Sequence, residues 1–142
     1  MSIEAAMRGV LVAATGVANI VATNSTSNDK AIRPERLAQT DSYPAIEIQI
    51  TSETHQEDLG GWDGTSDVEV TLFCVAETAQ QAAALVKAVR QTLTSISNVS
   101  SVHGRIESVV LTDTEGSYEP EADGSDEGVY VKALSCSVWF VE

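Results

Sequence analysis

The clearest pattern in the chain is a strand that leads directly into an amphipathic helix between Asp67 and Leu93. Before residue 77, apolar residues occupy every second position, which is the spacing of a half-buried strand: Val68, Val70, Leu72 and Cys74. After Thr78, which suits a helix N-cap, apolar residues recur at helical spacing in one stripe: Ala82, Leu85, Val86, Val89 and Leu93. Neither apolar face is stable in water, so the helix has to pack against a sheet. We predict that this unit forms the core of the fold and carries no chemistry.

The same periodicities predict further elements on both sides of this unit. Apolar residues recur at i, i+3, i+4, i+7 and i+8 from Ile3 and predict an N-terminal helix that ends at Gly16, followed by a short apolar piece at residues 17–22. The further strands that we expect are residues 31–34 (short), 43–50, 102–111 and 129–141. The loops that we expect are residues 23–29, 95–101 and 112–128, and the first, rich in Ser, Thr and Asn, is expected to be exposed and mobile.

A glycine-rich link joins the strand at 43–50 to the strand that begins at Val68. Three glycines fall within five residues, at positions 60, 61 and 64, which indicates a turn or a hairpin tip. We therefore predict a long antiparallel hairpin between these two strands. The order of elements predicts one α+β domain over residues 1–142, with a mainly antiparallel four- to five-stranded sheet and two helices packed on one face.

Charge narrows the possible functions. The 142 residues contain 8 Lys and Arg against 21 Asp and Glu, a net charge of −13 at pH 7. Such a surface repels nucleic acid and anionic membranes, so direct DNA binding is disfavoured. No leader or membrane span is expected, because Glu4 and Arg8 interrupt the N-terminus and the apolar run at residues 10–14 is too short. We expect a cytosolic protein, or one that is assembled in the cytosol.

The residues with chemical potential form no recognisable site. Cys74 and Cys136 lie in apolar strand patterns and are expected to be free and buried, with a disulfide between neighbouring strands as the lesser alternative. His55 and His103 are far apart in sequence, and no nucleophile or phosphate-binding motif accompanies them. Residues 123–128 offer oxygen ligands suited to calcium but lack the ligand pattern of an EF-hand. We expect no enzyme activity, no cofactor and no metal.

The order of several short segments along the chain gives a further signal, although none of them is specific alone. They are Ile3-Glu4-Ala5-Ala6, Arg33-Pro34-Glu35-Arg36-Leu37, Tyr43-Pro44-Ala45-Ile46-Glu47-Ile48, residues 68–74, the helix at 79–93, Arg105-Ile106-Glu107-Ser108, Ser117-Tyr118-Glu119-Pro120 and residues 128–140. In this order and spacing they resemble the tail-terminator (tail-completion) family of tailed bacteriophages and prophages, over nearly the whole chain. The Ser/Thr/Asn-rich stretch near residue 26 and the marked acidity depart from that family.

The resemblance implies a structural role in place of a reaction. A protein of this family forms a hexameric ring that caps the end of the tail tube, stops tube polymerisation and joins the tail to the neck. The expected partners are other copies of this chain, the tail tube protein and a head-side neck or connector protein. Genome DNA would pass through the lumen without specific binding. The expected location is the tail or neck of the virion, after assembly in the host cytoplasm.

Five residues are candidates for the interface with neighbouring subunits or with the tube. Leu59 and Trp62 are apolar residues in the glycine-rich link, and Trp is enriched among interface hot spots. Arg33 and Arg36 are among the few positive charges that would offset repulsion between acidic subunits. Glu119 belongs to the Tyr-Glu-Pro segment that carries part of the resemblance.

Three other functions are kept as alternatives. The nearest is another neck component, such as a head–tail connector or stopper. A calcium-dependent binding module built on residues 113–127 and a small hydrolase-like enzyme are the others. The size of the particle in solution separates most of these functions, because a ring is several times heavier than one chain.

Overall fold

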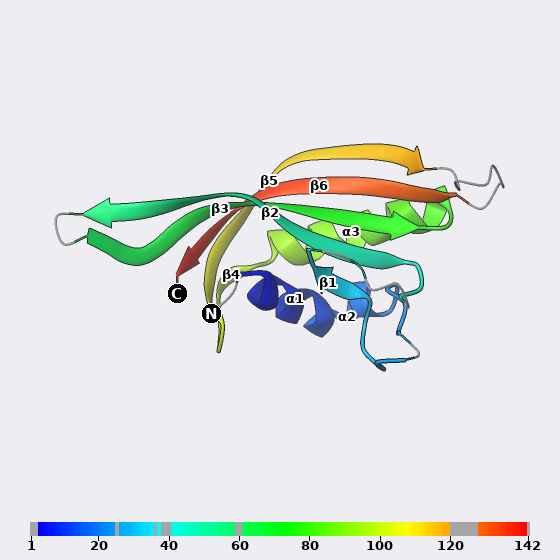
Figure 1. The fold of residues 1–142 in the computed structure, drawn as a ribbon, viewed down its shortest axis with the longest axis horizontal. Coiled ribbons are helices and arrows are strands. Elements are labelled where there is room, and N and C mark those ends of the chain that lie inside the picture. Colours follow the sequence, from blue (N-terminus) through cyan, green and yellow to red (C-terminus); the bar gives the residue numbers. More distant parts are fainter. Residues whose placement is uncertain are drawn as a thin grey trace.

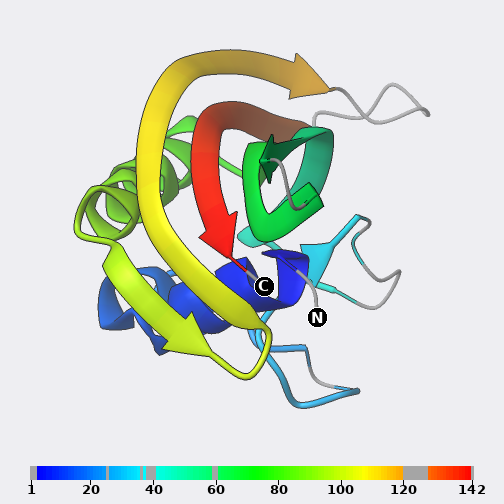
Figure 2. The ribbon, with the colours of Figure 1, turned by 90° about the vertical axis from the view of Figure 1, so that its left-hand side faces the viewer.

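The computed structural model describes residues 3–24, 26–35, 37, 41–58, 61–119 and 128–141. In these residues the chain forms a curled sheet whose concave side is covered by helices (Figure 1, Figure 2). The helices are α1 (Ile3–Ala13), α2 (Thr15–Ala18) and α3 (Ala79–Thr94). The strands are β1 (Ile32–Pro34), β2 (Ala45–Asp58), β3 (Gly61–Ala76), β4 (Ser97–Ser101), β5 (Gly104–Glu119) and β6 (Val129–Val141).

The sheet is mainly antiparallel. Its described strands follow the order β1-β2-β3-β6-β5-β4, in which only β1 and β2 are parallel neighbours. The predicted α+β fold with helices on one face and a long hairpin is therefore confirmed. The described sheet has six strands where four to five were expected, because residues 97–101, expected to be a loop, form the edge strand β4, and α2 adds a third helix.

The predicted core is confirmed almost position by position. The stripe on α3 is buried throughout, and the Thr78 hydroxyl caps this helix by accepting a 3.1 Å hydrogen bond from the backbone N–H of Gln81. The alternating apolar residues of β3 and β6 are buried beneath α3 and α1. The inward residues of these two strands are Val68, Val70, Leu72, Cys74, Leu134, Cys136, Val138 and Phe140.

The N-terminal helix ends earlier than predicted. Helix α1 stops at Ala13, and Gly16 lies inside the short helix α2 in place of ending the first one. The reason is the spacing of Val17 and Val21, which are four residues apart and both buried. A helical turn places both side chains on the inner side, and the Val21 N–H donates to the Val17 carbonyl at 3.0 Å.

Two of the predicted loops are wrong in part. Residues 97–101 form β4, and β5 continues from the predicted end at Leu111 through Glu119. Polar composition was misleading here, because the ladder with β6 holds residues 113–118 without burying their side chains. This part of β5 is held by backbone hydrogen bonds to β6. Backbone pairing leaves no apolar pattern in the sequence, so the pattern could not predict it.

The two cysteines behave as predicted. Cys74 and Cys136 are free and buried, and burial raises the pKa of each thiol to about 12. Both thiols therefore stay protonated and unreactive at neutral pH. Separately, no helix in the described ranges combines the length and the apolar character that crossing a membrane requires.

Candidate assembly interface

The β2–β3 hairpin continues past the body of the domain as a two-stranded projection, here called the arm (residues 53–58 and 61–66). Strand β6 ends at Val141, which pairs with Thr65, so residues 61–64 have β2 on one side and no described strand on the other. Figure 1 shows the arm extending away from the sheet and the helices. Its sequence alternates no apolar residues, so it has no face that the core would bury.

Two irregularities shape the arm. The ladder between β2 and β3 shifts register between Ile50 and Ser52 and again between His55 and Glu57. Such bulges bend a strand and increase its twist. Gly64 has a φ of +87°, a conformation that side chains with a Cβ rarely adopt. The curvature of the arm is therefore encoded in its own backbone.

The structure places the predicted tip residues only in part. The strands run through most of the glycine-rich link, down to the pair of Asp58 and Gly61, so the connection is shorter than expected. Trp62 lies in β3 opposite Glu57, and its side chain is not among the described ones. Leu59 lies outside the described residues. The interface role of Leu59 and Trp62 stays a prediction.

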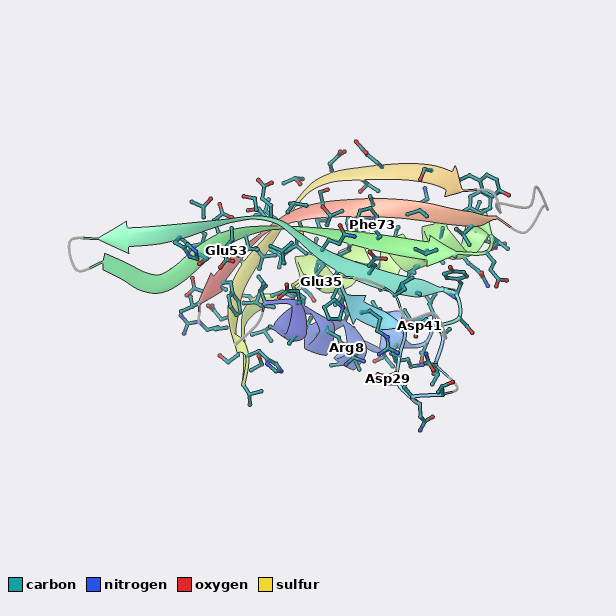
Figure 3. All side chains as sticks on the ribbon, in the orientation of Figure 1. Arg8, Asp29, Glu35, Asp41, Glu53 and Phe73 are labelled. Carbon is teal, nitrogen blue, oxygen red and sulfur yellow. The ribbon has the colours of Figure 1, made fainter. Side chains whose placement is uncertain are left out.

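Arg33 lies at the centre of a polar network, here called the Arg33 cluster (Arg8, Ser27, Asp29, Arg33 and Asp41). Its guanidinium donates to both carboxylate oxygens of Asp29, at 2.8 Å each, and to both oxygens of Asp41, at 3.0 and 3.1 Å. Arg8 donates to the Ile32 carbonyl at 2.7 Å and to Asp29 at 3.3 Å. Figure 3 shows Arg8, Asp29 and Asp41 together on the helix side of the sheet. The network fastens β1 to α1 and to the segment before β2.

The Arg33 cluster also explains why the polar stretch at residues 23–29 is not a wholly exposed loop. Asn24 is 1% exposed, and its side-chain oxygen accepts from the backbone N–H groups of Thr26 and Ser27. Its amide donates to Asp41 at 2.7 Å. The expectation that this stretch buries nothing is therefore wrong, because a buried asparagine replaces the missing apolar residues as its anchor.

Mutual hydrogen bonding shifts the pKa values inside this cluster. The hydrogen bond from Arg33, followed by the one from Ser27, lowers the pKa of Asp29 to about 2. Hydrogen bonds to Asp41 and Asp29 raise the pKa of Arg33 further above its ordinary value. The Arg33 side chain is 18% exposed, and the Asp41 side chain is 1% exposed. Arg33 thus has an intramolecular role, and its predicted contact with a neighbour stays a prediction.

The remaining candidates are placed only by their position in the chain. Arg36 lies outside the described residues. Glu119 is the last residue of β5, where its backbone pairs with Val129, and its side chain is not among the described ones. The structure does not bring the three described candidates into one site. Trp62 lies in the arm, Arg33 in the edge strand β1 and Glu119 at the far end of β5.

Both sides of the sheet have open edges, which sequence reasoning missed. Strand β4 pairs with residues 104–108 of β5, so residues 110–119 have β6 on one side and no described strand on the other. Strand β1 covers residues 46–48 of β2 and leaves the rest of its outer edge without a described neighbour. Val110 and Tyr118 on β5 are 60% and 46% exposed. Open edges of this length are able to pair with another chain.

The face of the sheet opposite the helices is acidic around a small apolar patch. Side chains alternate along each strand, so the neighbours of the buried residues point away from the helices. Two adjacent cross-strand rows on this face consist of Arg33, Glu47, Phe73, Ala133 and Glu115, and of Gln49, Thr71, Ser135 and Asp113. Three carboxylates therefore lie in two neighbouring rows of this outer face.

The described residues contain no complete catalytic or metal-binding geometry. His55 Nδ1 lies 3.0 Å from the Ser66 hydroxyl and 3.9 Å from Glu53. A Ser-His-acid triad needs the acid on the other ring nitrogen, whereas here both groups approach Nδ1, and Ser66 is only 2% exposed. No group of three or more His, Cys, Asp or Glu side chains in the described ranges is arranged to hold a metal ion. Of residues 123–128, which offer oxygen ligands suited to calcium, residues 123–127 lie outside those ranges.

Comparison with known proteins gives a match in fold. No protein-family model matches the chain, and a search of curated proteins finds no match. Among solved structures, the chain superposes on a chain of a particle described as the virion of a native gene transfer agent, with a TM-score of 0.62 and 17% sequence identity. The match covers 99% of this chain and 96% of that chain. The two proteins share one fold over nearly their whole lengths.

Proposed function

We propose that this protein is a structural component of a phage-like virion, and more narrowly a tail terminator. In this role copies of the chain form a hexameric ring on the last ring of the tail tube, stop its growth and present the surface to which the neck binds. The observation that carries the proposal is the end-to-end fold match with a chain of a virion particle. The order of sequence segments that resembles the tail-terminator family supports the same role.

The shape of the sheet supports a head-to-tail ring. A cyclic assembly uses two different surfaces of each subunit, one for each neighbour. The open edges of β2 and β5 lie on opposite sides of the sheet, and the arm adds a projection beyond the domain. A monomer derives no stability from these features, whereas a ring covers them. The role is binding, without catalysis, cofactor or metal.

The acidic outer face of the sheet is suited to line the lumen. A surface that carries Glu47, Asp113 and Glu115 repels DNA phosphates, so the genome slides past without being retained. The same charge opposes assembly, because each copy carries a net −13. We therefore propose that assembly strengthens as salt screens the repulsion between subunits.

The proposal is tested by measuring mass, shape and activity on the tube. Multi-angle light scattering at raised salt should give about 90 kDa, six times the 15.0 kDa chain, and negative-stain images should show rings. Added to the polymerising tube protein of the same virus, the ring should shorten the tubes and appear at one of their ends. A chain that stays monomeric at every concentration and leaves tube length unchanged would overturn the proposal.

The alternative within the same class is a head–tail connector or stopper. The shared virion fold does not by itself distinguish these neck positions. Binding partners separate them, because a terminator binds the tube end directly and a connector or stopper binds the head-side ring. Sedimentation of the protein with purified tubes, and separately with purified heads, assigns the position.

A further inference from the structure

A groove of about 430 Å³ lies between α1 and the β4–β5 hairpin. On the helix side it is lined by Ala5, Gly9 and Ala13, which are spaced four residues apart, and on the strand side by Val99 and Ile106. Arg8 and His103 supply its polar rim, and none of the described lining residues is acidic. In a chain with 21 acidic residues, this is an apolar and acid-free surface.

The space beside Gly9 on the groove side of α1 is open. A Cβ added at Gly9 would meet no atom within 4 Å, so nothing in the chain requires the absence of a side chain there. Glycine inside a helix costs about 0.5–1 kcal/mol relative to alanine. The open space above Gly9 allows something outside the chain to approach the helix backbone closely.

The groove and the base of the arm lie at the same level of the sheet. Arg105 pairs with Val141, and Val141 pairs with Thr65, where the arm leaves the body. Figure 1 shows the arm pointing away from α1 of its own chain, so it does not fill its own groove. A rotation about an axis along the strands, as in a ring, keeps arms and grooves of all copies at one common end.

The arm is complementary to the groove in charge and composition. Residues 53–66 contain four acids and no Lys or Arg, and they include Leu59 and Trp62. The groove offers small and apolar side chains together with His103 and Arg8, whose guanidinium is already hydrogen-bonded to Asp29 and to the Ile32 carbonyl. An acidic strand ribbon with an aromatic residue near its tip therefore matches a groove that is apolar at its floor and has no acidic residue among its described lining.

We propose that the groove between α1 and the β4–β5 hairpin receives the arm of a second copy of this chain. Each subunit inserts its arm into one neighbour and accepts the arm of the other, which gives a closed cycle. This inference rests on the proposed ring, and it identifies the docking surface that holds the ring together.

Gly9→Leu tests the groove, because the leucine side chain would occupy the floor of the groove without a clash inside the chain. The variant should stay folded, with an unchanged or raised melting temperature, while the dissociation constant of the assembly rises tenfold or more. Two matched controls are Gly9→Ala, which adds little volume, and Gly16→Leu, which also meets no atom within 4 Å but lies outside the groove. Gly16→Leu should assemble like the wild type, and Gly9→Ala should weaken assembly less than Gly9→Leu does. A Gly9→Leu protein with wild-type assembly would overturn the proposal.

Disulfide trapping tests the pairing directly. An Asp63→Cys variant is mixed with a mass-tagged Val99→Cys variant, and the disulfide-linked product that contains both is measured. The native Cys74 and Cys136 are buried and do not interfere. The control replaces Val99→Cys with Tyr118→Cys, at the far end of β5, where residue 118 is 46% exposed.

The outcomes separate this inference from the ring itself. The mixed product should form with Val99→Cys and not with Tyr118→Cys. If rings form but give no mixed product with Val99→Cys, or give it with Tyr118→Cys, the docking of the arm in the groove is contradicted. The proposed ring itself would still stand. A wild-type chain that is monomeric at every concentration would overturn both.

Discussion

Strands β2 and β3 each pass through two different environments. In the body, inward residues such as Ile48 and Leu72 are fully buried under α1 and α3, and the strands are held by a core. In the arm, the same two strands are joined by their backbone ladder, without an apolar face. A two-stranded ribbon alone is marginally stable in water. The body is therefore stabilised from inside the chain, whereas the arm has to gain stability from a partner.

This difference predicts that the stability of the fold and the assembly of the chain can be changed separately. Changes in the body should alter the free energy of unfolding, and changes in the arm should alter assembly while leaving unfolding almost unchanged.

Val86→Asp should cause the largest decrease in the free energy of unfolding. Val86 is 3% exposed in the stripe of α3, so the change buries a carboxylate without a partner, at a cost of about 3–5 kcal/mol. We expect loss of soluble folded protein, or a strongly lowered urea midpoint measured by circular dichroism. Lys87→Asp, on the exposed side of the same helix turn, is the control and should unfold like the wild type. Wild-type unfolding of Val86→Asp would show that this face is not buried.

Arg33→Met should have an intermediate effect. It leaves the Asp41 side chain, which is 1% exposed, without its guanidinium partner. Because Arg33 is itself partly solvated, we expect about 2–3 kcal/mol of destabilisation in urea unfolding. Arg90→Met, on the exposed side of α3, should change the free energy of unfolding by less than about 0.5 kcal/mol.

The pH dependence of unfolding of Arg33→Met isolates the electrostatic contribution of Arg33 to the stability of the fold. The pKa of Asp29 is about 2 in the folded chain and 3.8 without the fold, so its stabilisation is complete above pH 4 and is lost as the pH falls toward 2. Wild-type stability should therefore decrease with falling pH across this window. Arg33→Met should decrease less steeply there. Parallel slopes for the two proteins would show that Arg33 does not hold the Asp29 carboxylate in its charged form.

The two environments also differ in how much of them the sequence predicts. In the body, burial imposes a period on the residues, and the stripe of α3 and the alternation of β3 were predicted to the residue. Strand β5 beyond Leu111 and the Arg33 cluster were missed, because backbone pairing and buried polar networks leave no apolar period. Asn24 and Asp41 lie 17 residues apart, and their contact appears only in the fold. The groove was missed for the same reason, since its two walls come from α1 and β4–β5.

Trp62→Ala tests the arm. With no core beneath the arm, the variant should unfold within about 0.5 kcal/mol of the wild type. Light scattering should show weaker ring formation, and tubes should be capped less efficiently. Replacing residues 59–64 with a short Gly-Ser link should have the same effect in stronger form. An unchanged oligomer mass with normal tube termination would favour a tip folded back on its own sheet, and would move the interface to residues 113–127 or to the Arg33–Arg36 segment.

Addition of calcium should have the smallest effect on the stability of the fold. A ligand that binds only the folded chain stabilises it by RT ln(1 + [L]/Kd), so a site with a Kd of about 10 μM would add about 2.7 kcal/mol at about 1 mM calcium. For a domain of this size that gain would raise the melting temperature by roughly 5–10 °C. Residues 123–128 lack the ligand spacing of a closed site, so we expect a shift of less than about 1 °C. Magnesium at equal concentration is the control. A saturable rise with calcium alone would point to a calcium-dependent binding module, and the acidic segment before β6 would then have a ligand of its own.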